Sequence, residues 1–248
     1  MGADNTDKRR CIHALLLSGG KGSRLNAALP KQYIETSGMM MISRTINRLK
    51  ECGAVKDLWI VADSAWRTSI ENELSDRAFL KGFSDPGDTR QLSILNGLRD
   101  MKDLCGDEDI VLIQDAARPF TSDAVIGKCI EACAEHDGAM PVLPMKDTVY
   151  MSDDGSVISR LLKREKIFAG QAPEAFIYAK YLNACEALMP DEIYGINGSS
   201  EAAVLAGMDI AMIPGDEANF KVTTAADLKR YEALINALGP LTASEGGK

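Results

Sequence analysis

Residues 17–31 combine closely spaced glycines with two cations, and they follow an apolar run, residues 12–17, that is typical of a buried strand. Glycines allow the backbone to turn sharply, and successive N–H groups in such a turn form a concavity that binds anions. The glycines are Gly19, Gly20 and Gly22, and the cations are Arg24 and Lys31. These residue types are suited to holding a nucleotide triphosphate. The simpler alternative is an ordinary glycine-rich turn between a strand and a helix.

Two common phosphate-binding loops are excluded by the spacing. A Walker loop requires Gly-x-x-x-x-Gly-Lys-Ser/Thr, but Lys21 is followed by Gly22. A dinucleotide-binding loop requires Gly-x-Gly-x-x-Gly, and Leu25 stands at its third glycine position. Arg24 and Lys31 nevertheless favour a phosphate-binding role over an ordinary turn.

The composition limits the classes of partner. The chain has 248 residues, of which 46% are hydrophobic, and 28 basic against 36 acidic residues give a net charge of −8. This balance argues against non-specific nucleic-acid binding, and it means that local cations must attract a polyanionic substrate. No apolar run approaches membrane-spanning length, and residues 1–10 lack the apolar region of a signal peptide. We expect a cytoplasmic protein that binds neither nucleic acid nor membrane.

The cysteines and histidines point to no chemistry of their own. None of the six cysteines forms a Cys-x-x-Cys pair, and we expect them to be reduced. Cys129 and Cys133 are more typical of core residues than of metal ligands. Because the chain has two histidines, His13 and His136, chemistry centred on histidine is not expected.

Strand and helix patterns alternate along the chain. They predict an α/β fold: one Rossmann-like nucleotidyltransferase domain over residues 11–240, with a mainly parallel mixed sheet covered by helices on both faces. Residues 1–10 are expected to be a disordered extension and residues 241–248 a flexible tail. Ligands of such sheets bind beyond the carboxyl ends of the strands, where the glycine loop, Asp115 and Arg118 fall. The predicted strands cover residues 12–17, 58–62, 110–113, 139–143 and 210–213, and the predicted helices cover residues 42–52, 90–104, 122–136, 179–188, 200–206 and 225–238.

Residues 146–168 break this alternation. Residues 147–151 and 157–160 flank a turn at residues 153–155, and together they predict a β-hairpin. A hairpin of this length with few inward apolar positions cannot bury itself in the core of a monomer. We therefore expect an arm that packs on a second subunit of a homodimer. A solvent-exposed flap is the alternative.

Further patches contain residue types that bind anions or hydroxyls, and each has a simpler alternative. Residues 87–93 place a turn, a cation and a hydroxyl at the start of a helix, a position that favours the binding of anions. The simpler alternative is that these residues only cap the helix. Asp115 and Arg118 end a strand, where the carboxylate holds a hydroxyl or a metal, or pairs with the arginine. Lys221 precedes the last helix, whose cap we expect to be Thr224. A basic cluster beyond the arm contains Arg160, Lys163, Arg164 and Lys166. Its simpler alternative is a basic face exposed to solvent.

In order and spacing, these patches resemble one family, the cytidylyltransferases that transfer CMP from CTP to a sugar-alcohol phosphate. Its members include 2-C-methyl-D-erythritol 4-phosphate and ribitol-5-phosphate cytidylyltransferases. The resemblance covers about residues 12–235. The matching motifs are Ser18-Gly19-Gly20-Lys21-Gly22-Ser23-Arg24, Pro30-Lys31-Gln32-Tyr33, Gly87-Asp88-Thr89-Arg90 with Ser93, Asp115-Ala116-Ala117-Arg118-Pro119, Lys146-Asp147-Thr148, Gly170-Gln171-Ala172-Pro173 and Asn219-Phe220-Lys221-Val222-Thr223.

The resemblance implies a role for each group of residues. Arg24, Lys31 and Lys221 would grip the triphosphate and stabilise the transition state. The implied nucleotide-binding residues are Ser18, Gly19, Gly20, Gly22, Gly87, Asp88 and Ser93. The implied acceptor-binding residues are Asp115, Arg118, Thr148 and Arg164, some of them reaching the partner subunit's site through the arm. Mg²⁺ is expected on the triphosphate itself, with few protein ligands.

Departures from the methylerythritol pattern lie on the acceptor side. Gln114 stands where that member usually has His, and residues 171–174 replace Gln-Thr-Pro-Gln with Gln-Ala-Pro-Glu. Residues 197–200 replace Thr-Asp-Glu-Ala with Asn-Gly-Ser-Ser. We expect 2-C-methyl-D-erythritol 4-phosphate as the acceptor, with ribitol 5-phosphate or a related polyol phosphate as the alternative. A sugar 1-phosphate nucleotidyltransferase and an inactive nucleotide-binding regulator are more distant alternatives.

Overall fold

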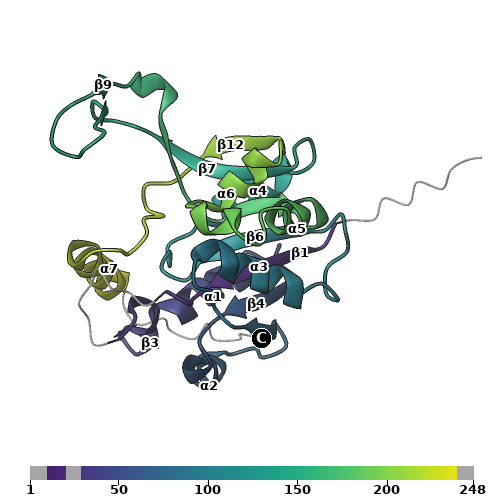
Figure 1. Ribbon diagram of the computed structural model, residues 1–248. Coiled ribbons are helices and arrows are strands. Elements are labelled where there is room, and N and C mark those ends of the chain that lie inside the picture. The colour runs from purple at the N-terminus through teal and green to yellow at the C-terminus, as the bar shows by residue number, and fades with distance from the viewer. Residues whose placement is uncertain (1–9, 21–28, 239–248) are drawn as a thin grey trace, which may run out of the picture.

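The computed structural model describes residues 10–20 and 29–238, and an eight-stranded sheet forms the centre of this part (Figure 1). The strands of the sheet are β1 (Ile12–Leu17), β4 (Asp57–Val61), β5 (Leu80–Ser84), β6 (Ile110–Asp115), β7 (Gly138–Pro144), β10 (Phe168–Gly170), β11 (Glu174–Ile177) and β12 (Ile210–Pro214). Their order is β10-β7-β11-β6-β1-β4-β5, and β12 pairs with β7. Strands β6, β1, β4 and β5 run parallel, while β11 is antiparallel to both β6 and β7. A separate two-stranded ribbon joins β2 (Glu35–Thr36) to β3 (Met39–Met40).

Helices cover both faces of the sheet. One face packs against α1 (Met41–Glu51), α2 (Ser64–Glu73) and α4 (Asp123–Ala132), and the other against α3 (Arg90–Asp100), α5 (Tyr178–Glu186) and α6 (Ser199–Leu205). The last helix, α7 (Ala225–Leu238), contributes Tyr231 and Ile235 to a third cluster around Met41 of α1. In the part of the chain that the structure describes, no helix is long and apolar enough to cross a membrane.

Strand β1 shows why an unbroken apolar run specifies the centre of this sheet. Ala14 and Leu16 belong to the core cluster beneath α1 and α4, and Leu15 belongs to the cluster beneath α3 and α5. Successive side chains of a strand point to opposite faces, so a strand covered on both sides needs apolar residues at every position. Since full burial of a leucine side chain contributes about 1.5–3 kcal/mol, this run holds β1 firmly between the two helical layers.

The predicted α/β architecture is confirmed, with differences at the element ends. Helix α3 ends at Asp100 and not at residue 104, because residues 101–105 form hydrogen-bonded turns. Helix α4 likewise ends at Ala132 and not at residue 136. Elements α2, β5, β10 and β11 were not predicted. Of the residues in α2 only Ile70 is buried, and β5 has a single buried residue, Ser84, so neither has a strong apolar pattern.

The predicted hairpin is present as an arm that protrudes beyond the sheet (Figure 1). Its paired strands are shorter than expected, with β8 (Tyr150–Met151) antiparallel to β9 (Arg160–Leu161). The second strand, predicted over residues 157–160, begins only at Arg160 in the structure. The Asp154 carboxylate accepts hydrogen bonds from the N–H groups of Ser156 and Val157, which holds this part of the chain in a turn.

Candidate active site

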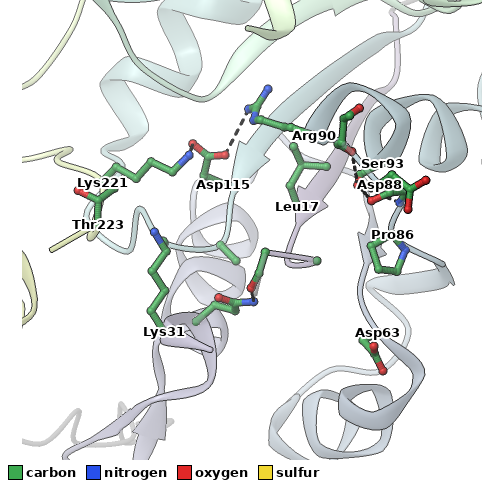
Figure 2. Close-up of a pocket in the computed structure, with 17 residues that line it drawn as sticks. Leu17, Lys31, Asp63, Pro86, Asp88, Arg90, Ser93, Asp115, Lys221 and Thr223 are labelled. Atoms are coloured by element: carbon green, nitrogen blue, oxygen red, sulfur yellow. Dashed lines mark hydrogen bonds and ion pairs between the residues drawn. The ribbon is translucent and has the colours of Figure 1, made fainter. Parts of the chain in front are cut away.

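A cavity of about 650 Å³ opens at the carboxyl ends of the parallel strands (Figure 2). Leu17 ends β1 and Asp115 ends β6, and the parallel register places these two residues side by side. The cavity is lined by Leu17, Gly19, Gly20, Lys31, Gln32, Asp63, Pro86, Gly87, Asp88, Thr89, Arg90, Ser93, Asp115, Ala116, Ala117, Lys221 and Thr223. Backbone from three separate loops therefore meets here, which is the location expected for a ligand site in this class of fold.

The segment after the glycine loop holds that loop in place. The Gln32 side-chain amide donates hydrogen bonds to the carbonyl oxygens of Ser18 at 2.7 Å and of Gly20 at 2.9 Å. The Ser18 hydroxyl donates to the hydroxyl of Tyr33 at 2.9 Å, and all three of these side chains are buried. Lys31 begins the short 3₁₀ helix that carries Gln32 and Tyr33, and it lines the cavity. The same segment thus anchors the loop and places a cation beside it.

Two glycines let a second loop approach the first. Gly19 lies so close to Pro86 that an added Cβ would stand 2.4 Å from the Pro86 Cβ. At Gly87 an added Cβ would stand 2.5 Å from the Cβ of Leu92 and 2.9 Å from its carbonyl carbon. A side chain at position 19 would push the loops after β1 and β5 apart, and one at position 87 would push the second loop away from α3. Gly19 therefore permits the close approach of the two loops, and Gly87 the close approach of the second loop to the start of α3.

Helix α3 begins at the second loop. The Thr89 hydroxyl accepts from the Leu92 N–H at 3.1 Å and caps the helix. The Ser93 hydroxyl accepts from the Gly87 N–H at 3.0 Å and donates to the Thr89 carbonyl at 2.9 Å. Asp88 and Ser93 also line the cavity. The two interpretations of residues 87–93, helix cap and ligand-binding loop, are therefore compatible.

Arg90, Arg118 and Lys221 surround the carboxylate of Asp115, and we call these four residues the Asp115 cluster. Oδ2 of Asp115 lies 2.9 Å from Nζ of Lys221, and Oδ1 lies 3.2 Å from Nη2 of Arg90 (Figure 2). Oδ2 also lies 3.4 Å from Nε of Arg118. Burial raises the pKa of Asp115, but the charges of Arg90, Lys221 and Arg118 outweigh it and hold that pKa well below its ordinary value. The carboxylate thus stays ionised, and the cluster has an excess of positive charge.

The loop before α7 brings Lys221 to this cluster. Nη1 of Arg118 donates to the carbonyl oxygen of Asn219 at 2.6 Å, and the Val222 N–H donates to the carbonyl oxygen of Ala117 at 2.9 Å. Asn219 is fully buried, and its side chain bonds to the backbone of the segment before β11. These contacts join two motifs that are distant in sequence, so the position of Lys221 depends on the fold as a whole. Thr224 caps α7 as predicted, accepting from the Asp227 N–H at 3.2 Å.

Comparison with known proteins places this arrangement in a family. The family model described as IspD, 2-C-methyl-D-erythritol 4-phosphate cytidylyltransferase, matches residues 12–237. The chain belongs to this family. Relatives named 2-C-methyl-D-erythritol 4-phosphate cytidylyltransferase from Geobacter metallireducens and Shouchella clausii are each 31% identical to it. Each comparison covers 90% of this chain, with 97% of the first relative and 95% of the second.

Solved structures agree with the IspD fold. The crystal structure of 4-diphosphocytidyl-2C-methyl-D-erythritol synthase from Anaerococcus prevotii aligns with a TM-score of 0.78 at 21% identity, covering 92% of this chain and 99% of that one. The structure of the IspD protein of Francisella tularensis aligns with a TM-score of 0.77 at 19% identity, covering 91% and 100%. At these identities the likeness concerns the fold. The prediction of a CTP-dependent cytidylyltransferase, made from the motifs, is confirmed by the family.

The structure brings most of the predicted site residues together. Those that line the cavity are Gly19, Gly20, Lys31, Gly87, Asp88, Ser93, Asp115 and Lys221. Ser18 and Arg118 do not line the cavity. The hydroxyl of Ser18 donates a hydrogen bond to Tyr33, and the guanidinium of Arg118 donates one to the carbonyl oxygen of Asn219. Gly22 and Arg24 lie outside the described residues. Thr148 and Arg164 are exposed on the arm and do not line the cavity of their own chain.

Several lining residues were not among the predicted site residues. Arg90 belongs to a recognised motif, but its contact with Asp115 joins two distant segments and has no local signal. Gln32 follows Lys31 in the Pro-Lys-Gln-Tyr motif, so the motif itself would have suggested it. Asp63 follows β4, which is apolar from Leu58 to Val61, at the carboxyl edge of the sheet, and that position was a usable signal.

Cys129, Cys133 and His13 are buried away from the cavity, and the core position predicted for the two cysteines is confirmed. Cys129 and Cys133 are buried, and burial raises the pKa of the Cys133 thiol to about 11. His13 is fully buried between the carboxylates of Asp57 and Asp109, each at 3.4 Å. These groups lie in or beside the strands that form the core, and none of them lines the cavity.

Proposed function

We propose that this protein transfers CMP from CTP to 2-C-methyl-D-erythritol 4-phosphate, releasing pyrophosphate and forming CDP-methylerythritol for isoprenoid synthesis. The observation that carries the proposal is the cavity in which the Gly19–Gly20 loop and Lys31 face the Asp115 cluster. The first group suits a triphosphate, and the second suits an acceptor with hydroxyls and a phosphate. Membership of the IspD family supports the same activity. The names of the relatives favour this acceptor over ribitol 5-phosphate.

The reaction needs charge stabilisation more than proton transfer. An oxygen of the acceptor phosphate attacks the α-phosphorus of CTP in line with the leaving group. The new P–O bond forms as the bond from the α-phosphorus to the bridging oxygen breaks, and pyrophosphate leaves with that electron pair. A phosphate monoester is already ionised near neutral pH, so no general base is required. Catalysis then rests on positioning and on cations that meet the developing negative charge.

Lys31 and Lys221 are the cations that we assign to this charge. They come to the cavity from two distant segments, Lys31 from the short 3₁₀ helix after the glycine loop and Lys221 from the loop before α7 (Figure 2). The carboxylate of Asp115 holds Lys221 at 2.9 Å before substrate binds, so little reorganisation is needed in the reaction. We assign the base and ribose of CTP to the end formed by Gly87, Asp88 and Ser93. Arg24 keeps its proposed role on the triphosphate by resemblance alone.

Mg²⁺ is proposed to enter with CTP. Three carboxylates line the described part of the cavity, those of Asp63, Asp88 and Asp115, and Asp115 is already engaged by three cations. These residues fit a metal held mainly by phosphate oxygens and water, which is the usual way in which Mg²⁺ binds at nucleotide sites. When bound, Mg²⁺ would neutralise part of the triphosphate charge.

The substrate assignment is tested by measuring pyrophosphate release. The purified protein is given each of the four nucleoside triphosphates with Mg²⁺, in combination with 2-C-methyl-D-erythritol 4-phosphate, ribitol 5-phosphate or a sugar 1-phosphate. We expect CTP with methylerythritol phosphate to give a kcat/KM at least about tenfold above every other pair, because unmatched hydroxyls leave polar groups of the site unpaired. Faster turnover with ribitol 5-phosphate would show that ribitol 5-phosphate is the acceptor. Faster turnover with a purine triphosphate would overturn the assignment of CTP as the donor.

We also propose that two copies of the chain assemble through the arm. Tyr150, Val157, Ile158 and Leu161 are each more than half exposed on this arm. Such a group of exposed apolar side chains is typical of an interaction surface. Thr148 and Arg164 lie on the same arm, outside the cavity of their own chain, so an acceptor site that uses them must receive them from the partner subunit.

A mixed dimer tests this arrangement. We expect Lys31→Ala and Arg164→Ala homodimers to be nearly inactive alone and to regain activity after dissociation and reassociation together. In a mixed dimer one site carries both substitutions and the other carries neither, so random exchange restores about a quarter of the wild-type sites. Subunit exchange is verified with two affinity tags. No recovery despite exchange would place Arg164 outside the partner's site, and a monomer by light scattering would exclude the assembly.

A further inference from the structure

Glu174 is a buried carboxylate that the proposed mechanism does not use. It begins β11, which lies between β6 and β7, and its side chain is 9% exposed. It does not line the cavity. A buried carboxylate is unfavourable unless a charge or hydrogen bonds compensate for it, so its partners indicate what it is there to hold.

Those partners lead directly to the cavity. Oε1 of Glu174 lies 4.0 Å from Nη2 of Arg90, and Oε2 accepts a hydrogen bond from the hydroxyl of Ser200. The same Arg90 nitrogen lies 3.2 Å from Asp115, and Nη1 of Arg90 donates to the hydroxyl of Ser199. The guanidinium of Arg90 is therefore held by β6, β11 and α6, whereas its backbone belongs to the first turn of α3. Figure 2 shows the Arg90 side chain pointing toward Asp115.

Arg90 is the arginine of the Asp115 cluster that substrate can reach. Its side chain is 29% exposed and lines the cavity, whereas that of Arg118 is 10% exposed and bonds to the Asn219 carbonyl. The resemblance implied Arg118, Thr148 and Arg164 as the residues that meet the acceptor phosphate. The geometry gives that position to Arg90, because an anion in the cavity meets its guanidinium first.

The interaction between Glu174 and Arg90 depends on charge more than on a direct hydrogen bond. At 4.0 Å the two groups attract one another without close hydrogen-bond contact, and the surrounding burial strengthens that attraction. With Glu174 ionised, three cations face two carboxylates. Without its charge, three cations face Asp115 alone, and Arg90 is drawn toward that carboxylate and away from an incoming anion.

We propose that Arg90 binds the phosphate of the polyol phosphate acceptor and that Glu174 is the positioning residue that holds the Arg90 guanidinium for it. This inference rests on the proposed function, because it takes the ligand of the Asp115 cluster to be the acceptor. It assigns Glu174, which departs from the Gln of the family's usual motif, a specific task in this chain. The Ser200 hydroxyl fixes the carboxylate from the other side.

Glu174→Gln is the central variant, because it keeps the shape and a hydrogen bond to Ser200 and removes the charge. We expect the KM for the acceptor to rise about tenfold, as for the loss of a charged interaction, while the Kd of CTP measured by calorimetry stays unchanged. Arg90→Lys keeps a charge but loses the planar fork, and we expect it to raise the same KM by at least as much. In the double variant the two effects should not multiply, since both substitutions disturb one guanidinium.

A pH series separates this task from a merely structural one. The charged groups that face Glu174 are Arg90, Arg118 and Asp115, and the other titratable neighbours are Tyr181 and Cys129. Burial raises the pKa of Glu174, so it takes up a proton at a higher pH than an exposed glutamate does. The difference in acceptor KM between wild type and Glu174→Gln should therefore shrink as the pH is lowered, and it should begin to shrink at a higher pH than the titration of an exposed glutamate would produce. Titration of the acceptor phosphate affects both proteins equally.

Controls keep the test decisive. Glu186→Gln makes the same chemical change in an exposed pair with Arg99 and should change nothing. If Glu174→Gln proves unstable in thermal melts, Ser200→Ala replaces it and should shift the acceptor KM in the same direction. Multiplying effects in the double variant, or an equal loss of CTP affinity, would overturn the inference. If wild type uses another polyol phosphate, the proposed acceptor fails, and the same comparison with the acceptor that is used still decides the role of Glu174.

Discussion

Lys31→Ala is expected to lower kcat at saturating CTP and acceptor by about 10²–10³-fold, and Lys221→Ala is expected to do the same. Each substitution removes a preorganised positive charge from a cavity whose ligands are phosphates. Because the charge on the equatorial oxygens changes during the transfer, the loss should appear in kcat more than in the KM of either substrate. Steady-state kinetics of pyrophosphate release, with calorimetric binding of CTP, separates the two effects.

The matched control for both variants is Lys180→Ala. Lys180 forms an exposed ion pair with Asp137 and does not line the cavity, so its removal should leave kcat within about twofold. Near-normal rates for both Lys31→Ala and Lys221→Ala would show that the mechanism is wrong. A loss confined to CTP binding would instead give these lysines a role in ground-state affinity.

The sequence alone was sufficient to predict those features of the fold that depend on a few consecutive residues. The run from Ile12 to Leu17 is apolar at nearly every position because helices cover both faces of β1, and this requirement is visible in a single strand. The glycine loop, Lys31 and the cap at Thr224 are equally local, since each depends on a few consecutive residues. Elements with few buried residues, such as α2 and β5, had no such pattern and were not predicted.

The partners within the site could not be predicted, because they come from distant parts of the chain. Asp115 meets Arg90 from α3 and Lys221 from the loop before α7, and no local spacing encodes either contact. The sequence also assigned Arg118 to the acceptor, although the fold turns it toward the Asn219 carbonyl. Motif resemblance therefore identified which residues gather, and the fold determined which of them face the cavity.

The electrostatics of the site differ from those of the whole protein. The chain carries a net charge of −8, yet the cluster of Arg90, Arg118 and Lys221 around Asp115 has an excess of positive charge. A polyanionic substrate is thus drawn by a local field that acts against the overall one. Since screening by salt is weak for buried charges, this attraction should persist at moderate ionic strength.

Asp115→Asn is expected to reduce the free energy of unfolding at pH 7 by about 3–5 kcal/mol, because it leaves three cations close together without their shared carboxylate. The folded-state pKa of Asp115 is lowered, so the stabilisation that it supplies is present above the unfolded pKa of about 3.9 and is lost as the pH falls through the folded value. The difference between wild type and Asp115→Asn should stay constant from pH 7 to about pH 5 and narrow only below about pH 4.

Urea unfolding of both proteins across this pH range measures that difference, and Asp123→Asn provides the comparison. Asp123 pairs with Arg48 at 2.9 Å on the surface, where its side chain is 58% exposed, so its replacement should cost no more than about 1 kcal/mol. A difference for Asp115→Asn that already narrows between pH 7 and pH 5 would mean that the three cations do not hold this carboxylate ionised. A cost no larger than that of Asp123→Asn would mean that the cations are stabilised by other groups, and that the Asp115 cluster is not the organising centre of the site.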